Sequence, residues 1–201
     1  RIGDARAIDP LAALLRDSVP RVRAQAAFAL GEIEDSAAAL PLALLLGRND
    51  EHDPHVRALA VEGLGKLRAG RFVPACIAAL SDTSNEVIEA AALASWQMQS
   101  SDAWKGLVRL TGEPAAGDAL RGKAVYALMR MLGAANQGRT PIPGGASLPE
   151  DARSRIRAAL IARIDDPDLF CRLSAVRGLG SFGDEASRAA LRAALSDQDW
   201  R

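Results

Sequence analysis

A twelve-residue segment recurs along this chain, and the recurrence constrains the fold more than any other feature. Its clearest copies span residues 22–33, 56–67 and 171–182, and weaker copies begin at Val87 and Ala124. Within each copy, small or apolar residues stand at the first position and 4, 7, 8 and 11 positions after it. This is the spacing of one buried stripe on an α-helix. Each copy therefore predicts one amphipathic helix.

A second, shorter apolar segment precedes each copy and predicts another helix. These segments span 9–15, 37–46, 72–80, 103–110 and 151–164. Asp or Pro occurs in most of the turns between the two helices, where Asp can cap free N–H groups and Pro is tolerated in the first helical turn. One such helix pair is too small to bury its own stripe, whereas stacked pairs share a continuous core. The sequence thus predicts an all-α fold, an α-solenoid of stacked antiparallel helix pairs (an α-α superhelix).

The composition agrees with this prediction. Ala (41 residues) and Leu (26 residues) make up one third of the 201 residues and aromatic residues only 4%, which favours helices and argues against an all-β fold. The longest conspicuous apolar stretch, 40–46, is far shorter than the roughly 18 residues of a membrane helix. With 25 basic and 25 acidic residues, charge gives no argument for nucleic-acid binding. We expect neither a membrane nor a nucleic acid as partner.

The recurring pattern, Asp and then Val-Arg-x-x-Ala-x-x-Ala-Leu-Gly-x-Ile, resembles HEAT repeats, in particular the bacterial HEAT-like repeats of phycobilisome lyases. We expect one solenoid over residues 1–201, with an inserted Gly- and Pro-rich loop at 134–149. Both ends match the interior of a repeat, so we expect a solenoid truncated at both ends. The expected repeats span about 5–35, 36–70, 71–100, 101–133 and 148–183, followed by a partial repeat at 184–201.

The resemblance also implies a ladder of hydrogen bonds in which a turn Asp and a helix Arg pair across neighbouring repeats. The expected members are Asp17, Arg23, Asp53, Arg57, Asp166 and Arg172. Because positions 88 and 125 hold Ile and Val, the ladder should be broken in the third and fourth repeats. The alternative is that Arg23, Arg57 and Arg172 form a row that binds an anion.

Glycines recur at one position of the repeated helix, namely Gly31, Gly65, Gly133 and Gly180. Isolated glycines are weak evidence for a nucleotide site, and we expect them to allow close packing between repeats. Cys76 and Cys171 have no metal or redox spacing, fall on buried stripes and fit a reducing compartment. We therefore expect them to be inert, and the protein to be cytoplasmic.

Three residues of one turn, His52, His55 and Asp53, are the candidates for a metal site. The alternative interpretation is a solvated turn in which Asp53 caps the next helix. Because no regular element sets the separation of the histidines, we expect no metal and no other cofactor. The sequence also shows no Ser, Cys or acid pair arranged for catalysis, so we predict no catalytic residues.

In solenoids of the kind that this chain resembles, the second helix of each repeat lines the concave face. The exposed positions opposite the buried stripe then predict an apolar strip beside a basic one, as in a peptide groove. The alternative is that Leu59 and Leu93 pack against neighbouring helices. The predicted groove consists of Phe28, Leu59, Glu62, Leu93, Gln97, Lys123, Arg130 and Arg177.

We therefore predict a non-enzymatic repeat scaffold that binds a protein or peptide on its concave helix face. The resemblance leaves an alternative, in which the chain is an accessory HEAT domain of a larger enzyme whose catalytic part lies elsewhere. That enzyme would be similar to a chromophore lyase or linked to a prolyl isomerase. A third hypothesis, duplex DNA binding as in alkyl-purine glycosylase relatives, is disfavoured by the charge balance.

Overall fold

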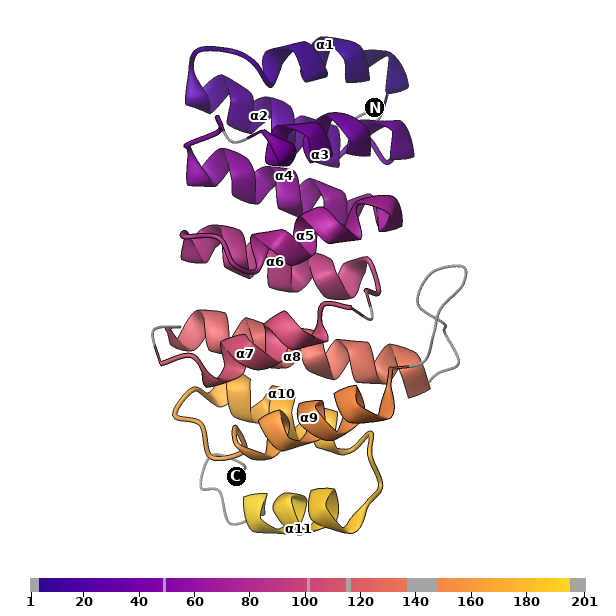
Figure 1. The fold of residues 1–201 in the computed structure, drawn as a ribbon, viewed down its shortest axis with the longest axis vertical. Coiled ribbons are helices and arrows are strands. Elements are labelled where there is room, and N and C mark those ends of the chain that lie inside the picture. The colour runs from indigo at the N-terminus through magenta and orange to yellow at the C-terminus, as the bar shows by residue number, and fades with distance from the viewer. Residues whose placement is uncertain (1–3, 49, 101, 115–116, 137–147, 196–201) are drawn as a thin grey trace. The chain divides into compact units, whose positions relative to one another are not determined.

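The structure, a computed structural model, describes residues 4–48, 50–100, 102–114, 117–136 and 148–195. Every regular element among these residues is a helix (Figure 1). The α-helices are α1 (Ile8–Leu14), α2 (Pro20–Gly31), α3 (Ala39–Gly47), α4 (Pro54–Lys66), α5 (Val73–Ala79), α6 (Asn85–Gln97), α7 (Trp104–Gly112), α8 (Asp118–Asn136), α9 (Glu150–Ile161), α10 (Leu169–Leu179) and α11 (Glu185–Ala194). Short 3-10 helices, η1 (Ala5–Ala7), η2 (Ser36–Ala38) and η3 (Gly70–Phe72), precede α1, α3 and α5. The predicted all-α solenoid of helix pairs is confirmed.

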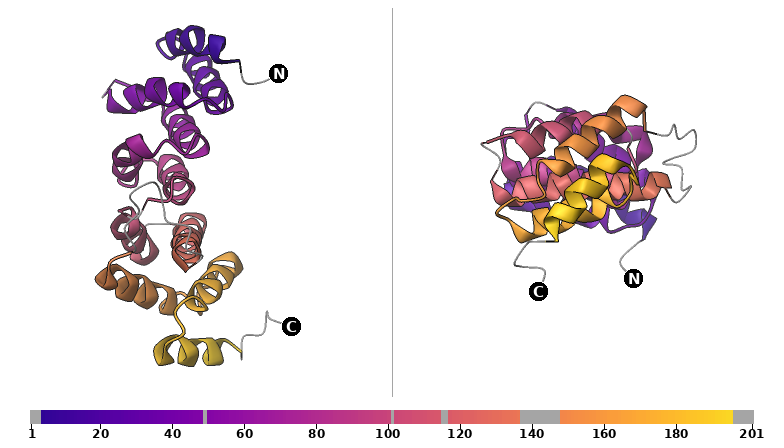
Figure 2. Two further views of the ribbon diagram at one scale, coloured as in Figure 1. Left: turned by 90° about the vertical axis from the view of Figure 1, so that its right-hand side faces the viewer. Right: turned by 90° about the horizontal axis from the view of Figure 1, so that it is seen from below.

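The chain divides into two compact units, unit 1 (Arg1–Ser100) and unit 2 (Ser101–Arg201), at the expected boundary between the third and fourth repeats. In unit 1, the second helices α2, α4 and α6 pack side by side as one layer, and α1, α3 and α5 form the other layer. In unit 2, α8 and α10 pack together, and α7, α9 and α11 lie on the other side (Figure 2). Each unit is thus a two-layer stack, in which first helices cover second helices.

Local sequence signals set the starts of the second helices. Asp53 is the N-cap of α4, and its carboxylate accepts hydrogen bonds from the N–H groups of His55 and Val56. Asp168 caps α10 in the same way, through the N–H group of Cys171. Helices α2 and α4 begin with Pro, whose fixed φ suits the first helical turn.

The core of each unit consists of the predicted apolar stripes. In α4, Val56, Ala60, Val61 and Leu64 are fully buried. Leu30, Leu42 and Leu45 fill the same core from α2 and α3, and Leu128, Leu132, Ile156 and Leu160 fill that of unit 2. The small Ala side chains between the large ones let neighbouring helices approach closely.

Helices of unit 1 approach closely at Gly31 of α2 and Gly63 of α4. A Cβ atom on Gly31 would lie 2.8 Å from the Cα of Gly63, and one on Gly65 would lie 2.9 Å from the Cα of Ala94 in α6. These two glycines have the predicted packing role. The prediction is wrong for Gly133 and Gly180, since within the described residues no atom of another helix lies within 4 Å of a Cβ at either position.

Both ends of the range in which an inserted loop was predicted, 134–149, belong to neighbouring elements in the structure. Helix α8 continues to Asn136, Leu148 is buried, and Pro149 is the N-cap residue of α9. The remaining part of that prediction, 137–147, lies outside the described residues. Of the expected partial repeat, α11 supplies the first helix, while 196–201 also lies outside the described residues.

Candidate protein-binding surface

In unit 1, Phe28 is the most exposed apolar side chain of the predicted groove. It projects from α2 with 45% of its surface accessible. The ammonium group of Lys66, on α4, lies 5.1 Å from the centre of its ring and forms an ion pair with Glu32 at 2.5 Å. A cation at this distance from a ring is attracted to the π face. Lys66 thus connects the exposed ring on α2 to the neighbouring helix.

The other predicted groove residues of unit 1 lie on α4 and α6 and are half-buried. Leu59 and Glu62 lie on α4, and Leu93 and Gln97 lie on α6. Gln97 packs against α4. A Cβ atom placed on Gly65 of α4 would lie 2.3 Å from the Oε1 atom of Gln97. Leu59 and Leu93 are each partly buried and partly accessible. This lies between the two interpretations of the sequence, in which these leucines either line a groove or pack against neighbouring helices.

The three basic groove residues belong to unit 2, where α8 and α10 carry them. Lys123 is half-buried, while Arg130 and Arg177 are exposed. The guanidinium carbon of Arg130 lies 5.9 Å from the ring centre of Tyr126, and that ring lies 5.6 Å from the ring of Phe170. Unit 2 thus presents aromatic rings among basic groups. Sequence reasoning did not include Tyr126 and Phe170 in the groove.

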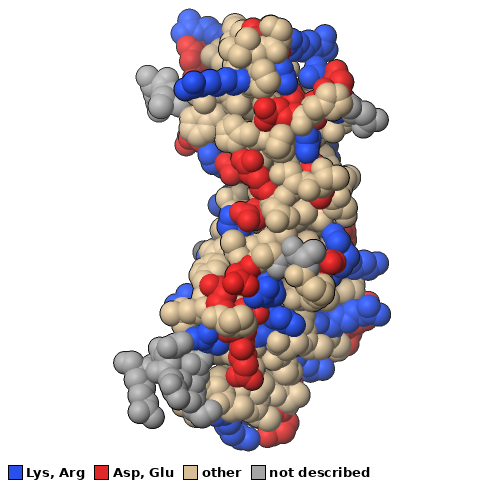
Figure 3. All heavy atoms as spheres, turned by 90° about the vertical axis from the view of Figure 1, so that its left-hand side faces the viewer, with Lys and Arg blue, Asp and Glu red and all other residues tan. Residues whose placement is uncertain are grey.

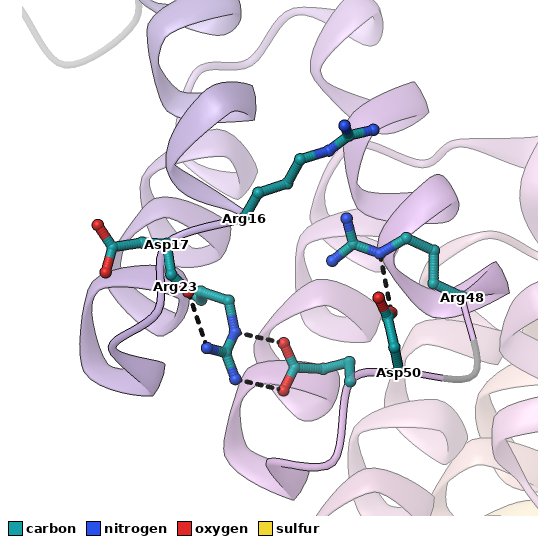
Figure 4. Close-up of a pocket in the computed structure, with 6 residues that line it drawn as sticks. Arg16, Asp17, Arg23, Arg48 and Asp50 are labelled. Carbon is teal, nitrogen blue, oxygen red and sulfur yellow. Dashed lines mark hydrogen bonds and ion pairs between the residues drawn. The ribbon is translucent and has the colours of Figure 1, made fainter.

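A second set of charged residues lies on the side of each unit where the turns join the two helices of a repeat. Acidic and basic side chains gather on this side (Figure 3). Arg23 donates from Nε and Nη2 to the carboxylate of Glu51 in the next repeat, at 2.6 and 2.8 Å (Figure 4). Arg57 binds Asp82 of the third repeat through the same two nitrogens, at 3.0 and 2.8 Å. Both pairs are bidentate, the strongest geometry for an Arg–carboxylate contact.

The backbone takes part in each of these contacts. The third nitrogen, Nη1, donates to the carbonyl oxygen six residues earlier, which is Asp17 for Arg23, Glu51 for Arg57 and Asp166 for Arg172. The carboxylate of the acidic residue in each turn also accepts a hydrogen bond from the N–H group two residues later, as Glu51 does from Asp53. The same backbone contact occurs at Asp17, Asp82 and Asp166. One arginine therefore joins its own turn to the next one.

This arrangement corrects the predicted ladder in the second repeat. Asp53 is not a member, because its carboxylate caps α4, and Glu51 takes its place. The repeat spacing carries this signal, since Glu51 stands six residues before Arg57, as Asp17 stands before Arg23. Each of the three guanidinium nitrogens of Arg57 is hydrogen-bonded, which disfavours the alternative of an anion-binding row.

The predicted break in the ladder is wrong for the fourth repeat. Arg121, three residues before Ala124, donates to the carboxylate of Asp166 at 2.7 and 3.0 Å. Arg172 bonds the backbone carbonyl of Asp166 rather than its carboxylate. A basic residue at a different helix position thus performs the same contact, because its side chain reaches the same turn from one helical turn away. In the third repeat, Ile88 is buried as an apolar residue.

The ladder carboxylates are buried (Glu51 and Asp166) or half-buried (Asp82), yet charged. Burial raises the pKa of Glu51, yet the hydrogen bonds from Arg23 and from the Asp53 amide outweigh it, so the pKa is lowered. The same balance lowers the pKa of Asp82, with Arg57 as the main partner, and that of Asp166, with Arg121 as the main partner. These carboxylates are therefore ionised at neutral pH and contribute to holding neighbouring turns together.

The three metal candidates of the turn at 52–55 have different surroundings. His52 is exposed, and His55 contacts Glu86 of α6 at 2.6 Å while Asp53 caps α4. Among the described residues, no group of three His, Cys, Asp or Glu could hold a metal ion. Burial raises the pKa of both Cys76 and Cys171 to about 12, so neither thiol is activated. In that same part of the chain, no helix is long and apolar enough to cross a membrane.

Comparison with known families identifies the repeats. A family model of HEAT repeats matches residues 42–129, a HEAT repeat model matches 7–36, and a PBS lyase HEAT-like repeat model matches 172–197. No curated protein sequence matches the chain.

Solved structures share the fold at low sequence identity. An engineered protein is 19% identical, with 93% of this chain and 84% of that chain covered and a TM-score of 0.65. A designed armadillo repeat protein in complex with the peptide (KR)4 is 21% identical, with 95% and 81% covered and a TM-score of 0.52. The complex of CpcE and CpcF of phycocyanin lyase from Nostoc sp. PCC7120 is 21% identical, with 96% and 100% covered and a TM-score of 0.53.

At these identities the likeness to solved structures establishes a repeat solenoid fold and no activity. The three family matches are all to HEAT-type repeats, and together they take in more than two thirds of the chain. The helix pairs of both units agree with these matches. The chain is therefore a HEAT-repeat protein.

Proposed function

We propose that this chain is a non-enzymatic scaffold that binds a protein or peptide on its second helices. The observation that carries the proposal is the exposed ring of Phe28 on the layer formed by α2, α4 and α6, which also carries the half-buried Leu59 and Leu93. Aromatic side chains surrounded by apolar groups commonly supply most of the binding energy at protein interfaces. A designed armadillo repeat protein of similar fold was solved in complex with the peptide (KR)4, which supports peptide binding by such a solenoid.

The layer is suited to a segment that lies across several helices. Each second helix of unit 1 presents at least one accessible apolar residue, and the layer also carries charged groups such as Glu62 and Lys66. Because the helices pack into a preformed layer, little conformational entropy is lost on binding. In unit 2, Lys123, Arg130 and Arg177 would receive acidic groups of a partner.

The test uses the 201-residue chain and peptides selected against it from a displayed random library. For a selected peptide, Phe28→Ala should weaken binding by about tenfold or more, since truncating an interface aromatic costs about 2 kcal/mol or more. Leu14→Ala is the matched control, because Leu14 is 42% exposed but lies on α1, in the other layer of unit 1. Equal loss in both variants, or in neither, would contradict the proposal.

A specific likeness favours a second candidate function, that of a subunit in a lyase-like enzyme. The match to a PBS lyase HEAT-like repeat and the full coverage of the phycocyanin lyase chain support it. The test is to incubate the chain with apo-phycocyanin and free bilin, then to separate the denatured acceptor protein. Bilin absorbance that stays with the denatured acceptor would support this candidate, and absorbance equal to a control without the chain would exclude it.

A further inference from the structure

The first-helix layer of unit 1 carries an apolar hollow that the proposed function does not use. It lies between α1 and α3, and its volume is about 390 Å³. The residues that concern its chemistry are Leu15, Arg16, Leu40, Pro41, Leu44 and Arg48. It is distinct from the second-helix layer that carries Phe28.

The apolar part of this hollow comes from an excess of leucine in α3. Leu42 and Leu45 face the core and are fully buried, whereas Leu40 and Leu44 are 50% and 60% exposed. A helix that needed only one buried stripe would place polar residues at these exposed positions. Leu40 and Leu44 stand four residues apart, so they form one ridge along the outer side of α3.

Two arginines supply all the charge that lines the hollow. Arg16 follows α1, and within the described residues its guanidinium group forms no hydrogen bond or ion pair. Arg48 follows α3 and is partly engaged, because its Nε lies 3.1 Å from Asp50 and its Nη2 donates to the carbonyl of Leu15 at 3.3 Å. Figure 4 shows the Arg16 side chain pointing away from Arg23.

The nearby acids do not neutralise Arg16. Arg16 and Arg48 also line a second, polar hollow of about 460 Å³, which contains Asp17, Asp50 and Glu51. Glu51 is paired with Arg23 and Asp50 with Arg48. The carboxylate of Asp17 accepts from the amide of Val19 and points away from Arg16 (Figure 4). A cationic group beside exposed leucines is therefore left without an acidic partner in this part of the chain.

We propose that this hollow, which we call the Arg16 hollow, binds an acidic amphipathic helix of a partner protein. A leucine or similar side chain of the partner packs between Leu40 and Leu44, and a carboxylate one helical turn away binds Arg16 and Arg48. The charge of the hollow selects an acidic partner over a basic one. Leu40 and Leu44 form an i, i+4 ridge of α3, the kind of ridge that packs into the groove between side chains of another helix, and we therefore propose a helical occupant.

The experiment uses two synthetic peptides of about 18 residues, long enough to form a helix on the surface. Both carry leucine at every third or fourth position, one with glutamate and the other with lysine between the leucines. Fluorescence anisotropy with the 201-residue chain at low salt should show at least about tenfold tighter binding of the glutamate peptide. No binding, or equal binding of both peptides, would overturn the proposal.

Variants locate the binding. Arg16→Glu and Leu44→Glu should each weaken binding of the glutamate peptide by about tenfold or more, and both side chains are exposed, so the fold is retained. The matched controls Arg155→Glu and Leu169→Glu change exposed residues of unit 2 and should leave binding within about twofold. Equal effects of the two pairs would overturn the proposal, as would self-association of the chain that Leu44→Glu abolishes. Phe28→Ala should leave this binding unchanged, so the result is independent of the proposed function.

Discussion

Substituting Gly31 tests the close approach of α2 and α4 directly. In Gly31→Ala, the added Cβ would lie 2.8 Å from the Cα of Gly63, whereas non-bonded carbon atoms prefer about 3.5–4.0 Å. The obstacle is backbone rather than a flexible side chain, so the two helices must separate by roughly 1 Å. That separation would loosen the contacts of Leu30 and Leu64, which are fully buried at this interface.

The expected magnitude follows from two opposing effects. Overpacking a core typically costs about 1–3 kcal/mol. Replacing Gly by Ala in a helix returns about 0.5–1 kcal/mol, and less at Gly31 because it is the last residue of α2. We therefore expect Gly31→Ala to lower the free energy of unfolding by about 1–2 kcal/mol.

Urea unfolding followed by far-ultraviolet circular dichroism measures this change. With an m-value of about 2 kcal/mol per molar, the midpoint of the transition should fall by about 0.5–1 M. Gly47→Ala is the control in the same unit, since no described atom lies within 4 Å of a Cβ there. It should raise stability by about 0.4–1 kcal/mol. If Gly31→Ala were as stabilising as Gly47→Ala, the inferred contact between α2 and α4 would be refuted.

Four further predictions concern the ladder, a helix cap and the cysteines. Glu51→Gln should destabilise unit 1 by about 1.5–3 kcal/mol at neutral pH, because Arg23 loses a buried charged partner; urea unfolding measures this, and no loss would contradict the ladder. Because the pKa of Glu51 is lowered in the folded chain, its carboxylate stabilises the fold at pH values above the unfolded pKa of about 4.3, and this stabilisation is lost as the pH falls below that value. The difference in free energy of unfolding between Glu51→Gln and the unchanged chain should therefore shrink in acid, and a larger difference in acid would count against the ladder. Asp53→Ala should cost about 1 kcal/mol through loss of the α4 N-cap, whereas Asp50→Ala, at an exposed surface pair, should cost less than about 0.5 kcal/mol in the same assay. Cys76 and Cys171 should react with a disulfide reagent at about pH 8 only after unfolding, since burial raises the pKa of both thiols to about 12; fast labelling of the folded chain would contradict their burial.

The helix pairs were predictable because the repeat makes each helix visible several times. Small and apolar residues at helical spacing recur in every second helix, so even the weaker copies at Val87 and Ala124 were recognisable. The starts of the first helices were less predictable, because three of them are preceded by a 3-10 turn, whose side-chain pattern differs little from that of an α-helix.

The ladder was only partly predictable, because its contacts join residues 25 to 45 positions apart. The expectation of an Asp in each turn suggested Asp53, although the six-residue spacing to Arg57 indicates Glu51. Arg121 lies off the repeat position, and no pattern in the sequence indicates that its side chain reaches Asp166. The packing glycines raise the same difficulty, since Gly133 and Gly31 share a repeat position but not a neighbour.

The candidate surface was also predictable only in part. Helical spacing was enough to find Phe28 and Arg130, because exposure follows from the position opposite the stripe. It could not find the pairing of Tyr126 with Phe170, which depends on the packing of α8 against α10. The leucine-rich segment 40–46 was the one sequence sign of the Arg16 hollow.

Photo-crosslinking to a selected peptide tests the central claim, partner binding by the second-helix layer, most directly. A photoreactive phenylalanine would replace Phe28 on α2 in one variant and Leu14 on α1 in another, both at exposed positions of unit 1. The account predicts that the selected peptide becomes attached at position 28 and not at position 14. Attachment at position 14 alone, or equal attachment at both positions, would contradict it.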